Sequence, residues 1–162
     1  MKKYLAEMVG TMVLVLMGCG VAVSLGCDPV NNIPAVVGTS VAFGLAVVAM
    51  AYTIGGISGC HINPAITLGC FLTGRISAKD CGMYMLFQVI GAFIGSALLY
   101  ALTSSADGSI AGTGANDLQL GVSPSAVCWL RLCSPAYSFS SCLVPHRRPT
   151  EPPTTSQDWL SV

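Results

Sequence analysis

The stretch SGCHINPAIT, residues 58–67, places a histidine, an asparagine and a proline between two long apolar segments. Asparagine is among the preferred N-cap residues of helices, and proline suits the first helical position because the N–H that it lacks would have no partner there. We therefore expect a helix to begin at Pro64 with Asn63 as its N-cap. If the Asn63 side-chain oxygen accepts from the backbone N–H of Ala65 or Ile66, its amide NH2 stays available to donate.

The apolar residues after this cap make too short a helix to cross a membrane. The run PAITLGCFLTG, residues 64–74, would rise roughly 15 Å, about half of the hydrocarbon thickness. The preceding run GGISGCHI, residues 55–62, is expected to have no regular structure, which membranes tolerate only inside protein or beside a water-filled cavity. We predict a re-entrant loop and half-helix over residues 55–74, with the electropositive helix N-terminus facing a wet cavity and disfavouring cations.

The composition indicates a membrane protein. Of 162 residues, 53% are hydrophobic and 9% are charged, and the mean hydropathy is +0.71, whereas an ordinary soluble domain is about one quarter charged. Three segments, residues 4–25, 35–54 and 81–102, carry no charged residue except Glu7, and Gln88 is the most polar side chain of the third. Each has the roughly 20 residues that a membrane helix needs. The lysines before the first segment also suit a signal peptide, but Glu7 and the length of the apolar run argue against it.

The placement of basic residues predicts the orientation. Lys2 and Lys3 precede the first apolar segment, Arg75 and Lys79 precede the third, and the other connections up to residue 130 carry no lysine or arginine. Positive residues favour the cytoplasmic side, so we expect a multi-pass protein of the plasma (inner) membrane with a cytoplasmic N-terminus. Because seven basic residues balance seven acidic ones, we expect the lipid bilayer rather than nucleic acid as the partner.

Cysteines and glycines are interpreted as small packing residues. The eight cysteines include no C-x-x-C pair, and His61 has no partner ligand at a suitable spacing, so we expect neither a metal nor a cofactor. Small residues recur four positions apart, as at Gly91 with Gly95 and at Gly18 with Ala22, which lets helices approach closely in lipid. Glycine is also simply frequent in membrane helices, so these pairs have an alternative explanation.

Over about residues 1–127 the chain resembles the aquaporin, or major intrinsic protein, family. The resemblance rests on AEMVGT at residues 6–11, AFGLAV at 42–47, SGCHINPAITLG at 58–69 and QVIGAFIGSALLY at 88–100. It implies an all-α membrane fold that corresponds to the N-terminal half of the family's inverted repeat, with three transmembrane helices and one re-entrant half-helix. It also implies a passive water channel rather than an enzyme, and a homotetramer for an intact member.

The resemblance carries pore roles to the re-entrant segment. Asn63, Pro64 and Ala65 match the first of the family's two Asn-Pro-Ala boxes, in which the asparagine donates to passing water. Four backbone carbonyls match the family's ladder of acceptors along the cytoplasmic half of the pore, those of Gly59, Cys60, His61 and Ile62. Without the resemblance, the lone His61 ring is interpreted as packed or hydrogen-bonded against the loop.

Two further residues acquire roles only through the resemblance. Glu7 matches a buried glutamate that accepts hydrogen bonds from N–H groups of the re-entrant loop, and the alternative is a glutamate near the interface that reaches water. Phe43 matches the aromatic residue that narrows the outer constriction in water-selective members. From the sequence alone, Phe43 is one apolar residue of a packed helix.

The character of the chain changes after residue 127. Five of the nine prolines, both tryptophans and three of the seven basic residues fall in residues 128–162, and glycine disappears. We expect this tail to be disordered, either as a genuine extension or because it is read in the wrong frame in place of the family's second half. Four residues there could in principle ligate zinc, but their spacing fits no finger pattern; they are Cys128, Cys133, Cys142 and His146.

Three functions are therefore weighed for the chain. The first is a passive water channel, in which water exchanges hydrogen bonds with the loop carbonyls and Asn63. The second is a facilitator of glycerol or another small neutral solute. The third is a truncated membrane fragment that conducts nothing, because the resemblance covers one half of the pore and no second Asn-Pro-Ala is present.

Overall fold

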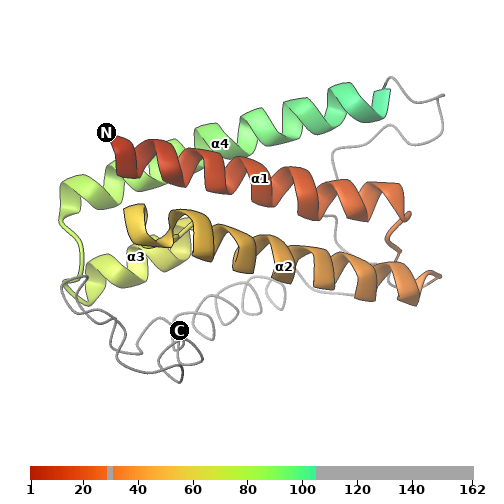
Figure 1. Cartoon of the computed structure of the whole chain (residues 1–162), viewed down its shortest axis with the longest axis horizontal. Coiled ribbons are helices and arrows are strands. Elements are labelled where there is room, and N and C mark those ends of the chain that lie inside the picture. The colour runs from red at the N-terminus through yellow and green to blue at the C-terminus, as the bar shows by residue number, and fades with distance from the viewer. Residues whose placement is uncertain (29–30, 105–162) are drawn as a thin grey trace, which may run out of the picture. The chain divides into compact units, whose positions relative to one another are not determined.

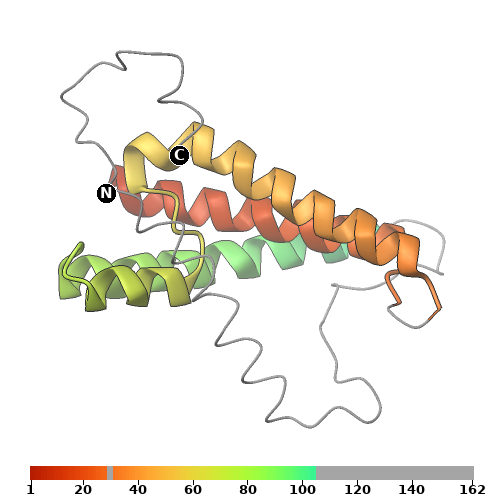
Figure 2. The ribbon, with the colours of Figure 1, turned by 90° about the horizontal axis from the view of Figure 1, so that it is seen from below.

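Helices make up all the regular structure in the part of the chain that the computed structural model describes, residues 1–28 and 31–104. In chain order they are α1 (Lys2–Ser24), α2 (Ile33–Ser58), α3 (Pro64–Leu72) and α4 (Ala78–Ser104). Figure 1 shows α1 lying between α2 and α4, and Figure 2 shows the same three helices from below. The prediction of an all-α fold is confirmed for this part.

Three of the four helices are long and apolar enough to cross a membrane. They have 23, 26 and 27 residues, whereas α3 has 9 residues and rises only about 14 Å at 1.5 Å per residue. The expected spans over residues 4–25, 35–54 and 81–102 thus correspond to α1, α2 and α4, whose observed ends lie up to a few residues away. Large apolar side chains on their outer sides are exposed, among them Val37, Leu45 and Phe93, which suits a lipid environment rather than water.

The end of α2 differs from the expectation for the re-entrant segment. Residues 55–58 were expected to be irregular, but α2 continues through them and ends at Ser58. Gly59 stops the helix, because it adopts the left-handed conformation (φ 87°) and its N–H donates to the Gly55 carbonyl, an arrangement that glycine adopts without a steric penalty. The irregular backbone is therefore confined to residues 59–63.

The return of the chain after α2 is short and reverses direction. The backbone turns back alongside the end of α2 before α3 begins, and α3 then runs toward the end of the bundle where α4 starts (Figures 1 and 2). The beginning of α1 lies at the same end, since the Tyr4 hydroxyl donates to Asp80 at 2.7 Å and Lys3 pairs with the same carboxylate at 2.9 Å. α3 packs against α4, so the short helix is held by the third long helix.

One side chain joins the end of α1 to the start of α2. The Asn32 oxygen accepts from the Ala35 N–H at 3.3 Å, which caps α2, and its amide donates to the carbonyls of Leu25 at 2.9 Å and Gly26 at 3.2 Å. Helix ends leave backbone groups without intrahelical partners. Asn32 satisfies such groups on both helices at once and so supports the antiparallel pairing of α1 with α2.

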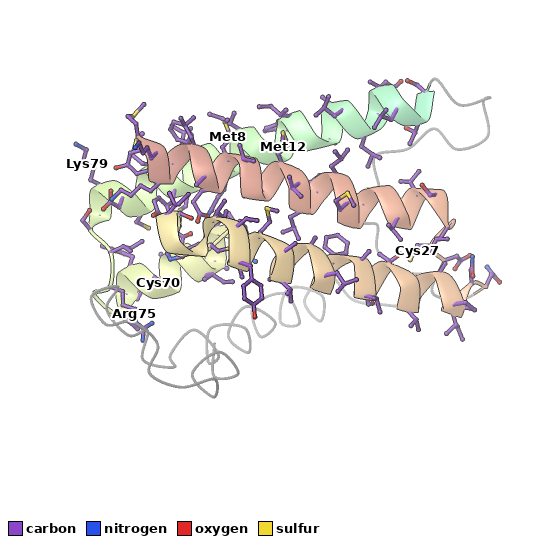
Figure 3. The ribbon with its side chains drawn as sticks, in the orientation of Figure 1. Met8, Met12, Cys27, Cys70, Arg75 and Lys79 are labelled. Atoms are coloured by element: carbon purple, nitrogen blue, oxygen red, sulfur yellow. The ribbon has the colours of Figure 1, made fainter. Side chains whose placement is uncertain are left out.

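Glycines bring α4 into close contact with α1. A Cβ built on Gly91 would collide with the carbonyl oxygen of Met8, and one on Gly95 would lie 2.7 Å from the carbonyl oxygen of Met12. Figure 3 shows Met8 and Met12 on the stretch of α1 that runs beside α4. The pair of small residues at Gly91 and Gly95 therefore lies at a helix contact, as the spacing predicts.

The expectations for the tail lie outside the described residues. These are the change of character at residue 128, the expected disorder of residues 128–162, the altered reading frame and the zinc ligand set.

Candidate functional site

The break between α2 and α3 carries an unusual backbone. Gly59 has φ 87°, and two residues with side chains also lie in the left-handed region, Cys60 at 52° and Ile62 at 39°. Such conformations are uncommon for non-glycine residues and persist where the surroundings hold them. Hydrogen bonds from the loop to the Glu7 carboxylate provide that restraint.

Glu7 of α1 is the centre of the restraint. Its side chain is 0% exposed. Oε1 accepts from Ser58 Oγ at 2.6 Å and from the His61 N–H at 2.9 Å, while Oε2 accepts from the Ile62 N–H at 2.6 Å and from Gln88 Nε2 at 2.8 Å. Backbone N–H and amide NH2 groups can only donate. Both carboxylate oxygens are therefore occupied as acceptors, the arrangement that an ionised carboxylate satisfies best.

A second set of polar side chains connects the loop to α3 and α4. Thr67 and Gln88 are 0% and 1% exposed, and Gln88 Nε2 donates to Thr67 Oγ1 at 3.0 Å. The His61 ring Nδ1 lies 3.2 Å from Thr67 Oγ1, and its ring meets Tyr84 edge-on with centroids 5.2 Å apart. The Tyr84 hydroxyl donates to the Ser58 carbonyl at 2.9 Å. Because these groups all meet around one carboxylate, we refer to them as the Glu7 cluster: Glu7, Ser58, His61, Thr67, Tyr84 and Gln88.

Most of the Glu7 cluster was not identified as functional from the sequence. The one available signal was Gln88, the most polar side chain of an otherwise apolar span, since a polar group in such a position needs a partner. Thr67 and Ser58 are small hydroxyl residues that give no such signal. Thr67 depends on Gln88 of α4, 21 positions away, and Ser58 depends on Glu7 of α1, 51 positions away along the chain.

Asn63 forms the N-cap of α3 with its side-chain oxygen. Oδ1 accepts from the Ala65 N–H at 2.8 Å, the backbone is extended at φ −151° and ψ 124°, and Pro64 is the first residue of the helix. Within the described residues, no protein acceptor lies within hydrogen-bond distance of the Asn63 Nδ2 amide. Pro64 and Ala65 are exposed, so the tip of α3 is open on the side away from the Glu7 cluster.

The backbone N–H groups of the loop bond to protein on the side of the Glu7 cluster. Ser58 Oγ accepts the N–H of Cys60, and Glu7 accepts those of His61 and Ile62. With these three donors engaged by protein, none of the three N–H groups is available to a ligand on the other side of the loop. Gly59 is exposed, whereas His61 and Ile62 are buried.

Phe43 lies apart from the loop, in the half of α2 nearer its start. Its side chain is half-buried, and its ring lies against Gly18 of α1. The structure thus brings the Asn63 cap, the loop and Glu7 together, and places Phe43 farther along the same pair of helices.

The described residues contain no grouping of side chains that is suited to a metal ion. Among residues 1–28 and 31–104, no three His, Cys, Asp or Glu side chains are grouped so as to hold an ion. The five cysteines of this region form no disulfide with one another.

The fold and the site define a class of protein. A bundle of long apolar helices that includes a short, capped helix beginning at a strained loop is typical of α-helical membrane channels and transporters, which admit irregular backbone only where it lines a cavity or is buried in protein. Residues 1–130 match the family described as major intrinsic protein. The chain belongs to that family, whose members are channels rather than enzymes.

Individual relatives agree with this assignment. A protein named Aquaporin Z from Rhodopseudomonas palustris is 53% identical over 106 residues, which cover 65% of this chain and 44% of the relative. Another from Bradyrhizobium diazoefficiens is 50% identical over 108 residues, covering 67% and 45%, and one from Brucella melitensis is 46% identical over 112 residues, covering 69% and 49%. The chain therefore spans a little under half the length of the relatives that it matches.

Proposed function

We propose that the described helices form one wall of a passive water pathway across the plasma (inner) membrane, with the N-terminus in the cytoplasm. The observation that carries the proposal is that the side-chain oxygen and the side-chain amide of Asn63 have different roles. Its oxygen is used by the cap of α3, at 2.8 Å from the Ala65 N–H, while its amide can donate to a molecule at the exposed tip of the helix. A permeating water would accept from Asn63 and donate to the loop carbonyls of residues 59–62.

The charges around the tip of α3 favour a neutral permeant. The N-terminus of a helix carries about half a positive charge, which repels cations from the narrow part of a pore. The Glu7 carboxylate does not contact the permeant directly, because it is 0% exposed and its four hydrogen bonds are to protein donors.

Water rather than glycerol is the proposed permeant. Phe43, as the narrow point of the outer half, would leave too little room for a larger solute. The relatives named Aquaporin Z support a water channel, and a homotetramer is proposed for the intact protein. No catalytic step is proposed for any residue.

The proposal is tested on the full chain, purified and reconstituted in liposomes, by stopped-flow light scattering after an osmotic shift. We expect water permeability above that of empty liposomes and glycerol permeability equal to theirs. Water permeability equal to that of empty liposomes would overturn the proposal and favour a non-conducting fragment. Glycerol entry faster than in empty liposomes would favour a facilitator of small neutral solutes.

A substitution at Asn63 separates conduction from folding. Asn63→Asp keeps a good N-cap oxygen for the Ala65 N–H but removes the amide donor. We expect the variant to fold and to lose water permeability roughly five- to tenfold, the equivalent of one hydrogen bond worth about 1 kcal/mol. Unchanged permeability in Asn63→Asp would show that the amide is not used by the permeant.

A further inference from the structure

Gly18 of α1 lies directly against the ring of Phe43. A Cβ built on Gly18 would be 2.5 Å from both Cδ1 and Cζ of that ring, and closer still to Cε1, whereas ordinary contacts begin near 3.4 Å. Three ring carbons therefore occupy the volume that any other residue at position 18 would fill. The Phe43 ring can occupy this position because glycine leaves the α1 backbone without a side chain at residue 18.

From this contact we infer that Gly18 is a positioning residue for Phe43 and sets how far the ring projects from α2 toward the pathway. The inference rests on the proposed function, because it takes Phe43 as the residue that narrows the pathway. One side of the ring is against Gly18 and the side chain is only half-buried, so a group added at Gly18 would push the ring away from α1. To restore an ordinary contact the ring would have to move by roughly 1 Å.

The effect is specific to this glycine. A Cβ on Gly20, two residues along α1, would meet Leu99 Cδ1 at an ordinary 3.6 Å, and a Cβ on Gly56, farther along α2, would meet nothing within 4 Å. Gly20→Ala and Gly56→Ala are therefore matched controls. Each adds the same methyl group to the same pair of helices without touching the Phe43 ring.

The position of the Phe43 ring can be measured without measuring water conduction. We would incorporate 4-fluorophenylalanine at position 43 of the full chain in liposomes and record its fluorine NMR signal. The signal is expected to shift in Gly18→Ala and to stay at its wild-type position in Gly20→Ala and Gly56→Ala. An unchanged signal in Gly18→Ala would overturn the inference.

A double-mutant cycle then tests whether Gly18 acts through the ring. With Phe43 present, Gly18→Ala is expected to lower water permeability severalfold, because the displaced ring narrows the pathway. In the Phe43→Ala background, Gly18→Ala is expected to leave the water and glycerol permeabilities as they are in Phe43→Ala alone. An equal effect of Gly18→Ala in both backgrounds would mean that Gly18 acts on helix packing in general, and would overturn the inference.

The outcomes distinguish this inference from the proposed function. If wild-type liposomes are no more permeable than empty ones while the fluorine signal still moves in Gly18→Ala alone, the water pathway fails and the positioning of the ring stands. If wild-type liposomes conduct water and the signal does not move, the positioning fails and the pathway stands. Should Gly18→Ala fail to fold, recovery of folding in Gly18→Ala with Phe43→Ala supports the steric contact, and equal failure of the double variant contradicts it.

Discussion

Glu7 shows how a carboxylate can be buried in an apolar bundle: among the described residues its partners are hydrogen-bond donors rather than a lysine or arginine. A buried charge is very unfavourable unless hydrogen bonds replace its hydration. Here two backbone N–H groups, a hydroxyl and an amide surround it at 2.6 to 2.9 Å. The same bonds hold the loop that contains the left-handed residues Gly59, Cys60 and Ile62, so the carboxylate and the strained loop stabilise each other.

Replacing Glu7 by glutamine tests that interdependence. In Glu7→Gln, one of the two oxygens becomes an NH2 group facing donors, so at least one buried donor loses its acceptor. We expect the free energy of unfolding to fall by about 2–3 kcal/mol, since each orphaned buried donor costs about 1–3 kcal/mol. The measurement is denaturant unfolding of the full chain in mixed micelles.

A second carboxylate provides the control for Glu7→Gln. Asp80→Asn removes a charge from the partly exposed pair with Lys3, whose nitrogen is 2.9 Å away, but keeps an oxygen that can accept from the Tyr4 hydroxyl. We expect little change because ion pairs at the protein surface contribute little. An equal fall in the free energy of unfolding in Glu7→Gln and Asp80→Asn would contradict a special role for Glu7.

The connection between α1 and α2 depends on a single side chain, Asn32, which bonds to both helices. Within the described residues its neighbour Asn31 bonds to Asp28 in the same turn, at 2.6 Å from the side-chain amide. The two residues are both asparagines, but Asn32 connects two helices, whereas the hydrogen bonds of Asn31 to Asp28 stay within its own turn.

We expect Asn32→Ala to lower the free energy of unfolding by about 1–2 kcal/mol, the usual effect of losing an N-cap, with the carbonyls of α1 losing a donor as well. Asn31→Ala should have a smaller effect. Both are measured by denaturant unfolding in mixed micelles, and an Asn31 effect as large as that of Asn32 would argue against the bridging role.

In lipid, the packing of two long helices depends on how closely their backbones can approach each other. With apolar solvent on all sides, helices gain little from burying apolar side chains and associate through close packing instead. Gly91 meets the Met8 carbonyl group, whose carbon would be 2.9 Å from an added Cβ. A backbone atom cannot rotate away as a side chain can, so α1 and α4 would have to separate.

Gly91→Ala is therefore expected to destabilise the chain by about 1–3 kcal/mol, the range for overpacking. Gly82→Ala, in the same helix, is the matched control, because a Cβ there meets nothing within 4 Å, and alanine is the better helix former. We expect Gly82→Ala to be neutral or slightly stabilising in the same unfolding assay. A Gly91→Ala variant as stable as Gly82→Ala would show that the two helices are not this close.

In the part of the chain that the structure describes, the basic residues are distributed asymmetrically along the bundle. Figure 3 shows Arg75 and Lys79 at one end of the helices and Cys27 at the other, and Lys2 and Lys3 lie at the start of α1, which is joined to α4 through Asp80. The basic residues of the described region thus collect at a single end, the distribution that the positive-inside rule associates with the cytoplasm.

Thiol labelling in intact bacterial spheroplasts tests this orientation. Cys27 is exposed and should react with a membrane-impermeant maleimide added outside. A cysteine introduced by Lys79→Cys should react only after the membrane is permeabilised. Mass spectrometry of the labelled peptides reads the two sites separately, and the reverse pattern would place the N-terminus outside.

Local signals were enough to predict the three long helices, the start of α3 and its asparagine cap. Hydropathy over about 20 residues and the cap chemistry of two adjacent residues act within one segment, so they can be read along the chain. The extent of α2 was misjudged at residues 55–58, because two glycines suggest a break in water but are tolerated in a helix inside a membrane.

The arrangement around the site could not be read in this way. The Glu7 cluster joins four helices and the loop, the Gly18 contact with Phe43 joins α1 to α2, and the Gly91 contact with Met8 joins α4 to α1. Each depends on which faces of separate helices meet, and many pairings of apolar helices satisfy the same hydropathy pattern. Close packing and the need to satisfy every buried polar group select one of those pairings, and both act only once the helices are together.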